Sequence, residues 1–345
     1  MSKRTDVKIS IQGLSKVFGP KTASMLPLID SGIDREQMLA KHNHVLALNN
    51  INMSLHSHSI EVIMGLSGSG KSTLIRHINR LIEPTAGKVI VDGQDICKMN
   101  AAQLRAYRQQ KTAMVFQNFA LLPHRTVIAN IGFGLQVKGE PERNVTQQSY
   151  YWLEKVGLLG YEKKYPAQLS GGMQQRVGLA RALACDADIL LMDEAFSALD
   201  PLIRSDMQDI LLGLQQELQK TIIFITHDLD EALKIGDRIA ILNHGKLIQQ
   251  GDAESILLHP ADGYVRRFVA DVNRTAILRA RSIMQAYQQP EPINGDTLVV
   301  QEDDTLSKVL HSMLSTDSYK AVVTNENGAA VGQIDSQMVA QAVNR

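Results

Sequence analysis

Short apolar runs of strand length recur along most of the chain. They lie at 45–55, 60–64, 189–192, 221–226 and 238–242, and the run at 189–192 is apolar at every position. A continuous apolar run is typical of a strand that is buried on both faces. Helix-compatible stretches separate these runs, and strands that alternate with helices predict a mostly parallel sheet with helices on its faces. The fold class is therefore α/β.

Other segments predict local elements around this sheet. We expect an opening strand pair at 6–18, a polar excursion at 20–44 that contains a short capped helix, a helix at 72–81 and a hairpin at 88–96. Residues 101–185 are compatible with helix throughout most of their length, with a polar interruption around 138–148. This predicts a largely helical region before the second buried strand.

A change of composition near residue 285 predicts a domain boundary. A chain of 345 residues is longer than most single cores allow. We expect a main domain at 1–284, a Pro- and Gly-containing linker at 285–292 and a separate small α/β unit at 293–345. The pattern of the small unit predicts a strand, a helix, a hairpin and a final helix.

Composition excludes several classes of protein. The 36 basic residues balance the 36 acidic ones, so no overall field favours nucleic acid or anionic lipid, and we expect no nucleic-acid partner. The two cysteines, Cys97 and Cys185, lack metal-ligand spacing and are expected to be reduced thiols. No apolar stretch reaches the roughly 18–20 residues of a membrane span, and the start has no signal-peptide pattern, so we expect a location in the cytoplasm.

The strand at 60–64 ends at a phosphate-binding loop, Gly65-Leu66-Ser67-Gly68-Ser69-Gly70-Lys71-Ser72. Glycines allow the backbone to wrap around phosphates, so that N–H groups and the start of the next helix point at the anion. Lys71 is expected to reach the β- and γ-phosphates, and the Ser72 hydroxyl to bind Mg²⁺. The predicted nucleotide-binding residues of this loop are Gly65, Ser67, Gly68, Ser69, Gly70, Lys71, Ser72 and Thr73.

Two adjacent carboxylates, Asp193 and Glu194, end the apolar run that starts at Ile189. At the tip of a strand Asp193 can hold Mg²⁺ through water, and Glu194 can polarise an attacking water molecule. An isolated acidic pair at a strand end is often only a solvated cap. Beside a complete phosphate loop, the pair favours hydrolysis of ATP, with ATP and Mg²⁺ as the cofactors.

Between these elements, Leu169-Ser170-Gly171-Gly172-Met173-Gln174-Gln175-Arg176 resembles the signature motif of ABC (ATP-binding cassette) ATPases. By itself the segment predicts a Ser N-cap before a glycine-rich helix start. The resemblance implies that Ser170, Gly171, Gly172 and Gln174 meet the γ-phosphate bound to a second copy of the chain. It also implies a P-loop NTPase fold, with a RecA-like core, a β-subdomain and a helical subdomain at about 118–185.

The same resemblance assigns roles to four further residues. Gln117 resembles the Q-loop glutamine that contacts Mg²⁺ and water, and Asp200 belongs to a segment that resembles the D-loop. His227 resembles the switch histidine that grips the γ-phosphate, and with Lys71, Gln117 and Glu194 it makes up the catalytic set. Phe18 occupies the place of the aromatic that stacks on adenine, although an ordinary core aromatic remains the alternative.

Long stretches, including 63–96, 165–184 and 189–211, resemble the ATP-binding subunit of glycine betaine/proline-type importers. This branch implies a homodimer at the cytoplasmic face of the membrane, bound to integral permease subunits and served indirectly by an extracytoplasmic substrate-binding protein. Residues 293–345 resemble one CBS-type repeat, with a regulatory or a dimerisation role. Closure of the dimer is expected to move 118–135 against a short permease helix.

Two positions depart from the branch. His58 and Glu61 stand where relatives commonly have a turn glycine and an apolar strand residue. A buried acid is costly unless it is paired, so we expect Glu61 to have a partner or to be partly exposed. We also expect replacement of Glu61 by valine to leave the protein equally or more stable.

Several other functions remain as alternatives. The same ATPase could serve import of choline, histidine or another amino acid, because no residue of this chain contacts the cargo. A non-transport ABC ATPase would need a long heptad insertion, or a second cassette, that the sequence lacks. An adenine-nucleotide sensor with degenerate catalysis is disfavoured by the intact Lys71, Asp193, Glu194 and His227.

Overall fold

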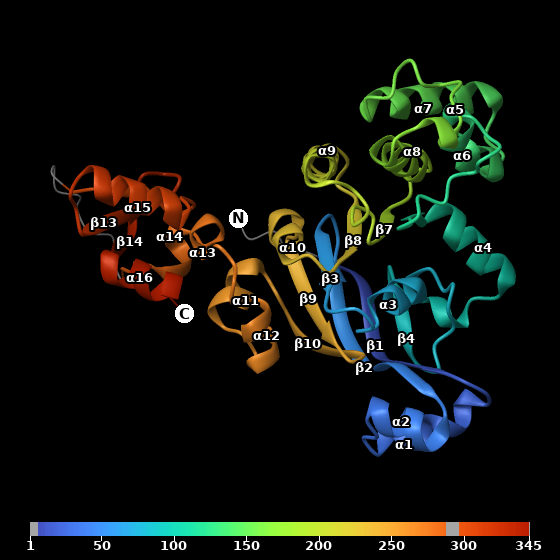
Figure 1. Ribbon diagram of the computed structural model, residues 1–345, viewed down its shortest axis with the longest axis horizontal. Helices are drawn as coiled ribbons and strands as arrows, with labels where there is room; N and C mark the ends of the chain where they lie inside the picture. Colours follow the sequence, from blue (N-terminus) through green and yellow to red (C-terminus); the bar gives the residue numbers. More distant parts are fainter. Residues whose placement is uncertain (1–5, 288–296, 345) are drawn as a thin grey trace. The chain divides into compact units, whose positions relative to one another are not determined.

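The computed structural model describes residues 6–287 and 297–344. They belong to two compact units, Met1–Gln250 and Gly251–Arg345. Figure 1 labels the helices and strands of both units.

The first unit contains an antiparallel sheet and a larger, mainly parallel sheet. The antiparallel sheet has the strand order β2-β1-β4-β5, with β1 at Val7–Phe18, β2 at Val45–His56, β4 at Ala86–Val91 and β5 at Gln94–Asp95. The larger sheet has the order β10-β9-β3-β8-β7-β6, with β10 at Lys246–Gly251, β9 at Arg238–Asn243, β3 at Ile60–Met64, β8 at Thr221–Thr226, β7 at Ile189–Asp193 and β6 at Thr112–Val115. Strands β9, β3, β8, β7 and β6 pair in parallel. The predicted α/β class with a mostly parallel sheet is confirmed.

Helices fill the connections between these strands. They are α1 at Leu26–Asp30, α2 at Arg35–His42, α3 at Lys71–Ile78, α4 at Ala101–Gln110, α5 at Val127–Ile131, α6 at Phe133–Lys138, α7 at Glu142–Lys155, α8 at Gly171–Ala184, α9 at Pro201–Leu218 and α10 at Leu229–Ile235. Helices α5 to α8 pack on one another and form the helical part of this unit, drawn in green in Figure 1.

One hydrophobic core joins the two sheets of the first unit through α3. It combines Ile9 and Leu55 of the antiparallel sheet with Leu74 of α3 and with Leu191 and Ile223 of the parallel sheet, all of them buried. Burying a side chain of this size contributes about 1.5–3 kcal/mol. The helix that follows the glycine-rich loop is therefore fixed from both sides.

Two of the predicted elements were wrong. Residues 7–18 form one strand and not a strand pair, because Gly13 adopts a positive φ of 61° within a bulge and its N–H donates to Asn52. The region 101–185 contains strand β6, which lies at the edge of the sheet and depends on pairing with β7. The polar stretch around 138–148 does interrupt the helices, at 139–141 between α6 and α7, but its second part forms the start of α7, whose apolar side buries Val145 and Trp152.

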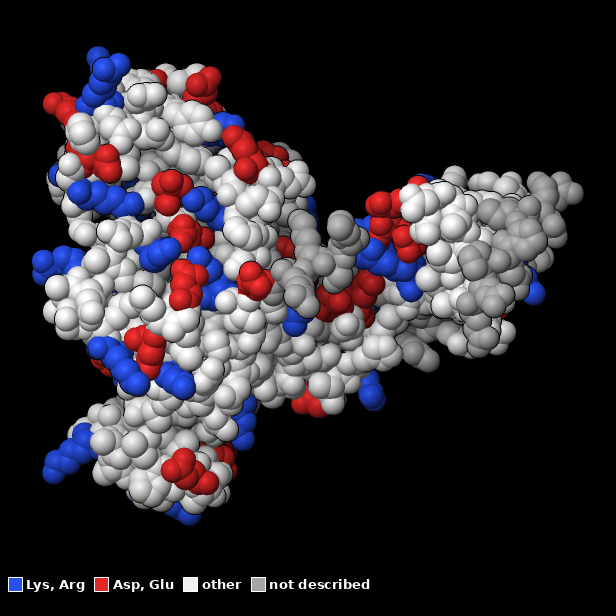
Figure 2. Space-filling model, turned by 180° about the vertical axis from the view of Figure 1, so that it is seen from behind, with Lys and Arg blue, Asp and Glu red and all other residues white. Residues whose placement is uncertain are grey.

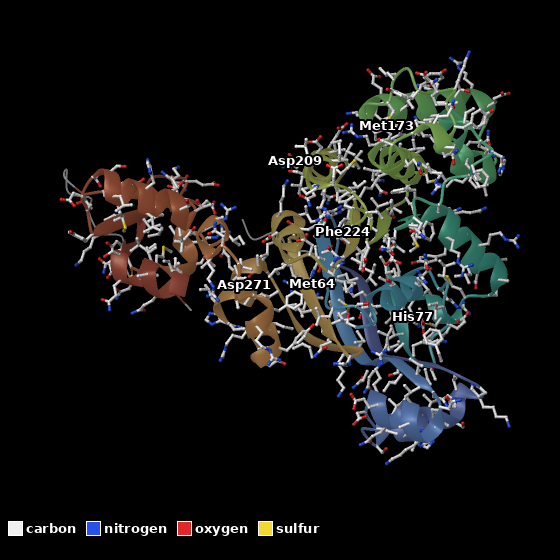
Figure 3. All side chains as sticks on the ribbon, viewed as in Figure 1. Met64, His77, Met173, Asp209, Phe224 and Asp271 are labelled. Atoms are coloured by element: carbon white, nitrogen blue, oxygen red, sulfur yellow. The ribbon has the colours of Figure 1, made fainter. Side chains whose placement is uncertain are left out.

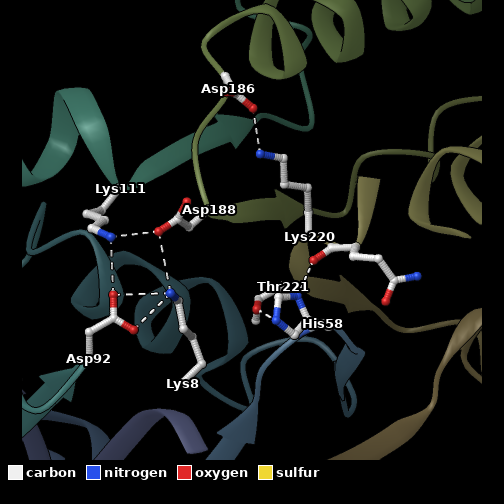
Figure 4. A network of polar contacts seen from close by, with 9 residues as sticks. Lys8, His58, Asp92, Lys111, Asp186, Asp188, Lys220 and Thr221 are labelled. Carbon is white, nitrogen blue, oxygen red and sulfur yellow. Dashed lines mark hydrogen bonds and ion pairs between the residues drawn. The ribbon is translucent and has the colours of Figure 1, made fainter. Parts of the chain in front are cut away.

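Charged and polar side chains gather at the amino ends of the parallel strands (Figure 4). Lys8 and Lys111 both contact Asp92 and Asp188, and the Nζ of Lys111 lies 2.7 Å from the Asp188 carboxylate. Burial acts to raise the pKa of Asp188, but the hydrogen bond from Lys111 and the charge of Lys8 outweigh it and leave that pKa lowered. This network ties the antiparallel sheet to the starts of β6 and β7.

His58 lies in the turn before β3, beside the same edge (Figure 4). Its φ of 58° falls in the left-handed region, which explains why a glycine is the residue more commonly suited to this turn. The backbone N–H of His58 donates to the hydroxyl of Thr221 at 3.1 Å, and its ring nitrogen contacts the carbonyl of Gln219. These two contacts hold a histidine in a backbone conformation that costs it energy.

The second unit contains a small four-stranded sheet and six helices among its described residues. The sheet has the order β11-β14-β13-β12, with β11 at Gln285–Ala286, β14 at Ala330–Asp335, β13 at Lys320–Thr324 and β12 at Val299–Gln301. The helices are α11 at Ala253–Leu258, α12 at Gly263–Phe268, α13 at Arg274–Ile277, α14 at Ala280–Ile283, α15 at Leu306–Ser315 and α16 at Ser336–Asn344. The strand, helix, hairpin and helix predicted beyond residue 293 are all present.

Residues before the predicted linker, and the first residues of the linker itself, contribute to this second unit. Buried Arg274 of α13 donates to the carbonyl of Ala342 on α16 at 3.4 Å, and β11 pairs with β14. Part of the predicted linker, 288–292, lies outside the described residues. The division of the chain at 250/251 thus precedes the boundary that composition suggested, and the CBS-type character of 293–345 stays a prediction.

The surface of the first unit carries both signs of charge. On the face shown in Figure 2, Lys and Arg are interspersed with Asp and Glu over this unit. Across the described part of the chain, no helix combines the length and the apolar character that crossing a membrane requires.

The expected partner of Glu61 is present. Glu61 is 1% exposed in the middle of β3, and its Oε1 accepts hydrogen bonds from the backbone N–H of His56 at 2.8 Å and from His56 Nδ1 at 2.7 Å. Arg238 Nε lies 4.0 Å from Oε2. The prediction of a partner is confirmed, and the contacts also reverse our expectation for valine at this position.

Glu61→Val is expected to lower the free energy of unfolding by about 1–3 kcal/mol, because it leaves the buried His56 N–H without an acceptor. Glu61→Gln retains an acceptor oxygen and should lose less. Urea denaturation of the full chain and of both variants measures the difference. Equal stability of the valine variant and the unaltered chain would show that the carboxylate has no structural role.

Candidate functional site

The predicted site residues lie at one edge of the parallel sheet. Met64 of β3 pairs with Thr226 of β8, and Asp193 of β7 pairs with Ile225. On the other side of β7, Val115 of β6 pairs with Met192. Parallel strands with ends in register place the segments that follow them side by side. The phosphate loop, Gln117, Glu194 and His227 therefore meet at the carboxyl edge of the sheet.

The glycine-rich loop needs its glycines for two separate reasons. Gly65 and Gly70 have φ values of 149° and 103°, which other residues rarely adopt. A Cβ on Gly65 would lie 2.1 Å from the carbonyl oxygen of Leu242, and one on Gly70 would lie 2.7 Å from that of Ala47. At both positions a side chain would therefore clash with neighbouring backbone.

Lys71 is held inside this loop. Its Nζ donates to the carbonyl oxygens of Gly65 at 2.8 Å and Leu66 at 3.2 Å. Burial lowers the pKa of Lys71, while the negative charges of Glu194 and Asp193 act to raise it. The lysine thus presents a partly desolvated cation at the start of α3.

Two side chains whose oxygen atoms could bind a metal ion, Ser72 and Asp193, lie beside Lys71. The hydroxyl of Ser72, on the first turn of α3, donates to Asp193 Oδ1 at 2.7 Å. The other oxygen of Asp193 accepts from Arg76 at 3.2 Å, one turn further along the same helix. A hydroxyl and a carboxylate on adjacent elements are oxygen ligands of the kind that Mg²⁺ prefers.

Glu194 has three partners among the predicted catalytic residues. Its carboxylate lies 3.7 Å from Lys71 Nζ, 3.5 Å from His227 Nδ1 and 3.3 Å from Gln117 Nε2. The residue has a positive φ of 48°, and its carbonyl accepts a hydrogen bond from Ser197. Glu194 therefore turns away from the line of β7 and faces the side chains that the neighbouring strands supply.

The remaining phosphate-loop residues occupy different depths. Ser67 and Gly68 are exposed at the crest of the loop, whereas Thr73 is partly buried on the first turn of α3. The hydroxyl of Ser69 is buried and has no hydrogen-bond partner within the described structure.

Phe18 ends β1 with 42% of its surface exposed, so it does not belong to the core. Lys16 lies over its ring, with Nζ 5.0 Å from the ring centroid.

The signature segment begins α8 and lies apart from the phosphate loop. Ser170 is the N-cap and accepts from Met173 N–H, while the side chain of Gln174 donates to the carbonyl of Leu169. Gly171 and Gly172 form the first turn. In Figure 3, Met173 is well separated from Met64, the residue that precedes the phosphate loop. One copy of the chain does not bring these two motifs together.

The structure adds arginines that the sequence analysis did not single out. Arg76 follows Ser72 by four residues, a spacing that places both on one face of α3. Arg181 of α8 donates to the carbonyls of Phe119 and Ala120, two residues with positive φ just after Gln117. Arg204 pairs with Asp228, next to His227, and also donates to the carbonyl of Leu199. Asp200 itself is the N-cap of α9. Except for the helical spacing of Arg76, these contacts have no local signal in the sequence.

A phosphate-binding loop, two strand-end carboxylates and a histidine at one edge of a parallel sheet define a P-loop ATPase. The family model described as ABC transporter matches residues 48–197.

Curated relatives cover most of the chain. "Glycine betaine transport ATP-binding protein OpuAA" of Bacillus subtilis is 52% identical over 81% of this chain and 67% of its own length. "Glycine betaine/proline betaine transport system ATP-binding protein ProV" of Salmonella typhimurium is 44% identical over 97% and 88% respectively. The dimeric structure of the ATP-binding cassette MJ0796 bound to ADP and Pi is similar with a TM-score of 0.61 and 29% identity, over 71% of this chain and 98% of that one.

The chain therefore belongs to the family of ATP-binding subunits of ABC transporters. It binds ATP and is an ATPase coupled to transport. The predicted P-loop NTPase fold and the resemblance to the glycine betaine branch are confirmed.

Gly70→Ala is expected to weaken ATP binding about tenfold or more, because backbone strain of about 1–3 kcal/mol and the clash with Ala47 would displace the loop. Gly213→Ala is the matched control, since its Cβ would meet nothing within 4 Å on helix α9. Titration with a fluorescent ATP analogue measures both variants. Unchanged affinity of Gly70→Ala would contradict a rigid loop.

Proposed function

We propose that this chain hydrolyses ATP to energise import of glycine betaine and related compatible solutes across the cytoplasmic membrane. The observation that carries the cargo class is the 52% and 44% identity to two relatives named for glycine betaine transport. The geometry of the site supports the hydrolytic role, because Glu194 lies within contact distance of Lys71, His227 and Gln117.

Phosphate binding relies on the loop and on the helix that follows it. Lys71 supplies a fixed positive charge, and the N–H groups of Gly68 and Gly70 with the start of α3 favour an anion. Phe18 offers an exposed ring for the adenine, a contact worth about a kcal/mol that gives little base selectivity.

Magnesium fits the oxygen donors of Ser72 and Asp193, which lie 2.7 Å apart, with Gln117 as a further ligand. When bound there, Mg²⁺ would neutralise charge on the β- and γ-phosphates. The hydrogen bond from Arg76 orients Asp193 so that its other oxygen faces Ser72.

Hydrolysis then depends on Glu194. Its carboxylate accepts a hydrogen bond from the attacking water, which orients and polarises that water toward the γ-phosphate. His227 and Gln117 both contact Oε2 of Glu194, whereas Lys71 lies near Oε1, and His227 is placed to donate to a phosphate oxygen.

A second copy of the chain completes the site in this proposal. The signature residues Ser170, Gly171, Gly172 and Gln174 would contact the γ-phosphate bound to the partner, and Asp200 would lie at the contact between copies. The separation of α8 from the phosphate loop supports this arrangement, because a helix N-terminus with a serine cap is itself an anion-binding element.

The permease would dock against the helical part of the first unit. A groove here is lined by Leu122 and Phe133 of the segment 118–135 and by Phe116 and Val137 on either side of it in the sequence. The chain would thus bind integral permease subunits from the cytoplasmic face as a peripheral subunit, and an extracytoplasmic binding protein would act on it only indirectly. In the same proposal, 293–345 is a single CBS-like regulatory or dimerisation unit.

Glu194→Gln is expected to reduce ATP hydrolysis at least a hundredfold with little change in ATP binding, because the amide cannot polarise water as a carboxylate does. Glu154→Gln makes the same chemical change at an exposed position on α7 and should have no effect. In cells that carry each variant as the only copy, uptake of labelled glycine betaine should stop only with Glu194→Gln.

Choline, proline and histidine serve as competitors in the same uptake assay. Persistent betaine uptake with Glu194→Gln, together with loss of histidine uptake, would retain the ATPase mechanism and replace the cargo. Persistent hydrolysis by Glu194→Gln would contradict the catalytic assignment.

A further inference from the structure

An arginine of the segment 20–44 contacts the phosphate loop. Arg35, the first residue of α2, donates from its NH1 to the carbonyl of Gly68 at 2.7 Å. Its two terminal nitrogens lie 3.9 and 4.0 Å from the position that a Cβ on Gly68 would occupy. The guanidinium therefore covers the crest of the loop that binds the phosphates.

The segment that carries Arg35 has a core of its own. Ile29 and Met38 pack with Val17 of β1 and Leu46 of β2 in a small hydrophobic cluster. Asp34 caps α2 by accepting from Gln37 N–H at 2.7 Å, as the sequence predicted. The packing against β1 and β2 therefore fixes the segment, and the N-cap fixes the start of α2, where Arg35 lies.

The two ends of the segment 20–44 lie beside Phe18, the residue expected to stack on adenine. The segment starts two residues after Phe18, and Phe18 pairs with Val45, the first residue after the segment. Buried His44 closes the base, with its ring nitrogens 2.6 Å from the carbonyls of Pro20 and His42. The segment therefore extends from the base-binding end of the nucleotide site at Phe18 to the phosphate-binding end at Gly68.

Arg35 is also free of carboxylate partners. Within residues 6–287 and 297–344, no ion pair involves Arg35, although Asp34 and Glu36 flank it in the sequence. A cation that donates to a peptide carbonyl stabilises that peptide orientation. The N–H of the same peptide, that of Ser69, donates to the carbonyl of Leu66 at 3.1 Å, so Arg35 and Leu66 hold the Gly68–Ser69 peptide from its two sides. An unpaired positive charge close to a phosphate loop also favours an anion there.

We propose that Arg35 is a positioning residue for the nucleotide and couples the segment 20–44 to ATP binding. Arg35 holds the Gly68–Ser69 peptide of the phosphate loop. When a bound nucleotide fixes the loop, the contact with Arg35 therefore also fixes α2. In the other direction, α2 in this position favours the loop conformation that binds nucleotide. Such coupling is reciprocal, because the free energy that links two events is the same in both directions. This inference rests on ATP binding at the loop and is independent of the cargo.

The first measurement compares affinity for a fluorescent ATP analogue among full-length variants. Arg35→Ala should raise the dissociation constant about tenfold, which corresponds to about 1.4 kcal/mol, and Arg35→Lys should recover part of the loss. Lys41→Ala is the matched control, since it removes a cation from the exposed last turn of the same helix. In ATP hydrolysis, Arg35→Ala should raise KM by a similar factor and leave kcat unchanged, because Arg35 contacts no reacting atom.

The second measurement is hydrogen exchange of the backbone amides in 21–43, with and without the ATP analogue. Nucleotide should slow exchange of these amides in the unaltered chain and in Lys41→Ala. In Arg35→Ala it should slow exchange only in the phosphate loop. A simple loss of folding would not produce this pattern, since exchange in β3 and β7 would then rise as well.

Two outcomes would overturn the inference. Equal affinity of Arg35→Ala and the unaltered chain would remove the positioning role. Weaker binding without any nucleotide-dependent protection of 21–43 in the unaltered chain would leave Arg35 as a local support and refute the coupling. Failure of the unaltered chain to bind the analogue would instead contradict the proposed function, so the two failures are distinguishable.

Discussion

The site of the first unit depends on the parallel register of β3, β8 and β7. Strand β3 delivers the phosphate loop, β8 delivers His227, and β7 delivers Asp193 and Glu194. All three strands are buried along their whole length, so a shift of one residue in any of them would turn each side chain to the opposite face, disrupt the packing there and displace a functional group at the same time. The packing that makes the core therefore also sets the distances between the side chains that we propose to be catalytic.

The charged side chains at the carboxyl edge of the sheet have partners of opposite charge within the chain. Lys71 is desolvated, yet it lies between loop carbonyls and the Glu194 carboxylate, and Asp193 is shared by Ser72 and Arg76. Polar groups that are buried but paired keep a defined geometry, which electrostatic catalysis requires. The opposite edge of the sheet carries the structural ion pairs of Lys8, Lys111, Asp92 and Asp188, so structural and functional charges are separated by the length of the strands (Figure 4).

The sequence predicted the buried strands that are mostly apolar, and with them the edge where the site lies. Strand β3 and strand β8 have the predicted limits, because the signal of short, mostly apolar runs depends little on context. The sequence did not predict β6, whose four residues become a strand only by pairing with β7, and it placed the start of α7 too late, because the polar face of that helix resembled a loop. That Glu61 needs a partner was predictable from the cost of burying a carboxylate. That the partner is His56 was not predictable, and for this reason the structure changes the expected effect of Glu61→Val on stability. The contacts of Arg35 and Arg181 with loop carbonyls join residues that are distant in sequence, so no local pattern could reveal them.

The central claim is that one chain supplies an incomplete site and that a second copy completes it. The most direct test mixes two full-length variants that are each inactive alone: Lys71→Ala, which removes the phosphate-loop cation, and Gly171→Asp, which places a negative charge in the signature segment. In a mixed dimer, one site combines the intact loop of the second variant with the intact signature of the first. The account predicts that mixing restores ATP hydrolysis in proportion to the mixed dimers formed, up to about one active site per dimer. No activity at any mixing ratio, with mixed dimers shown to form, would contradict a site shared between two copies.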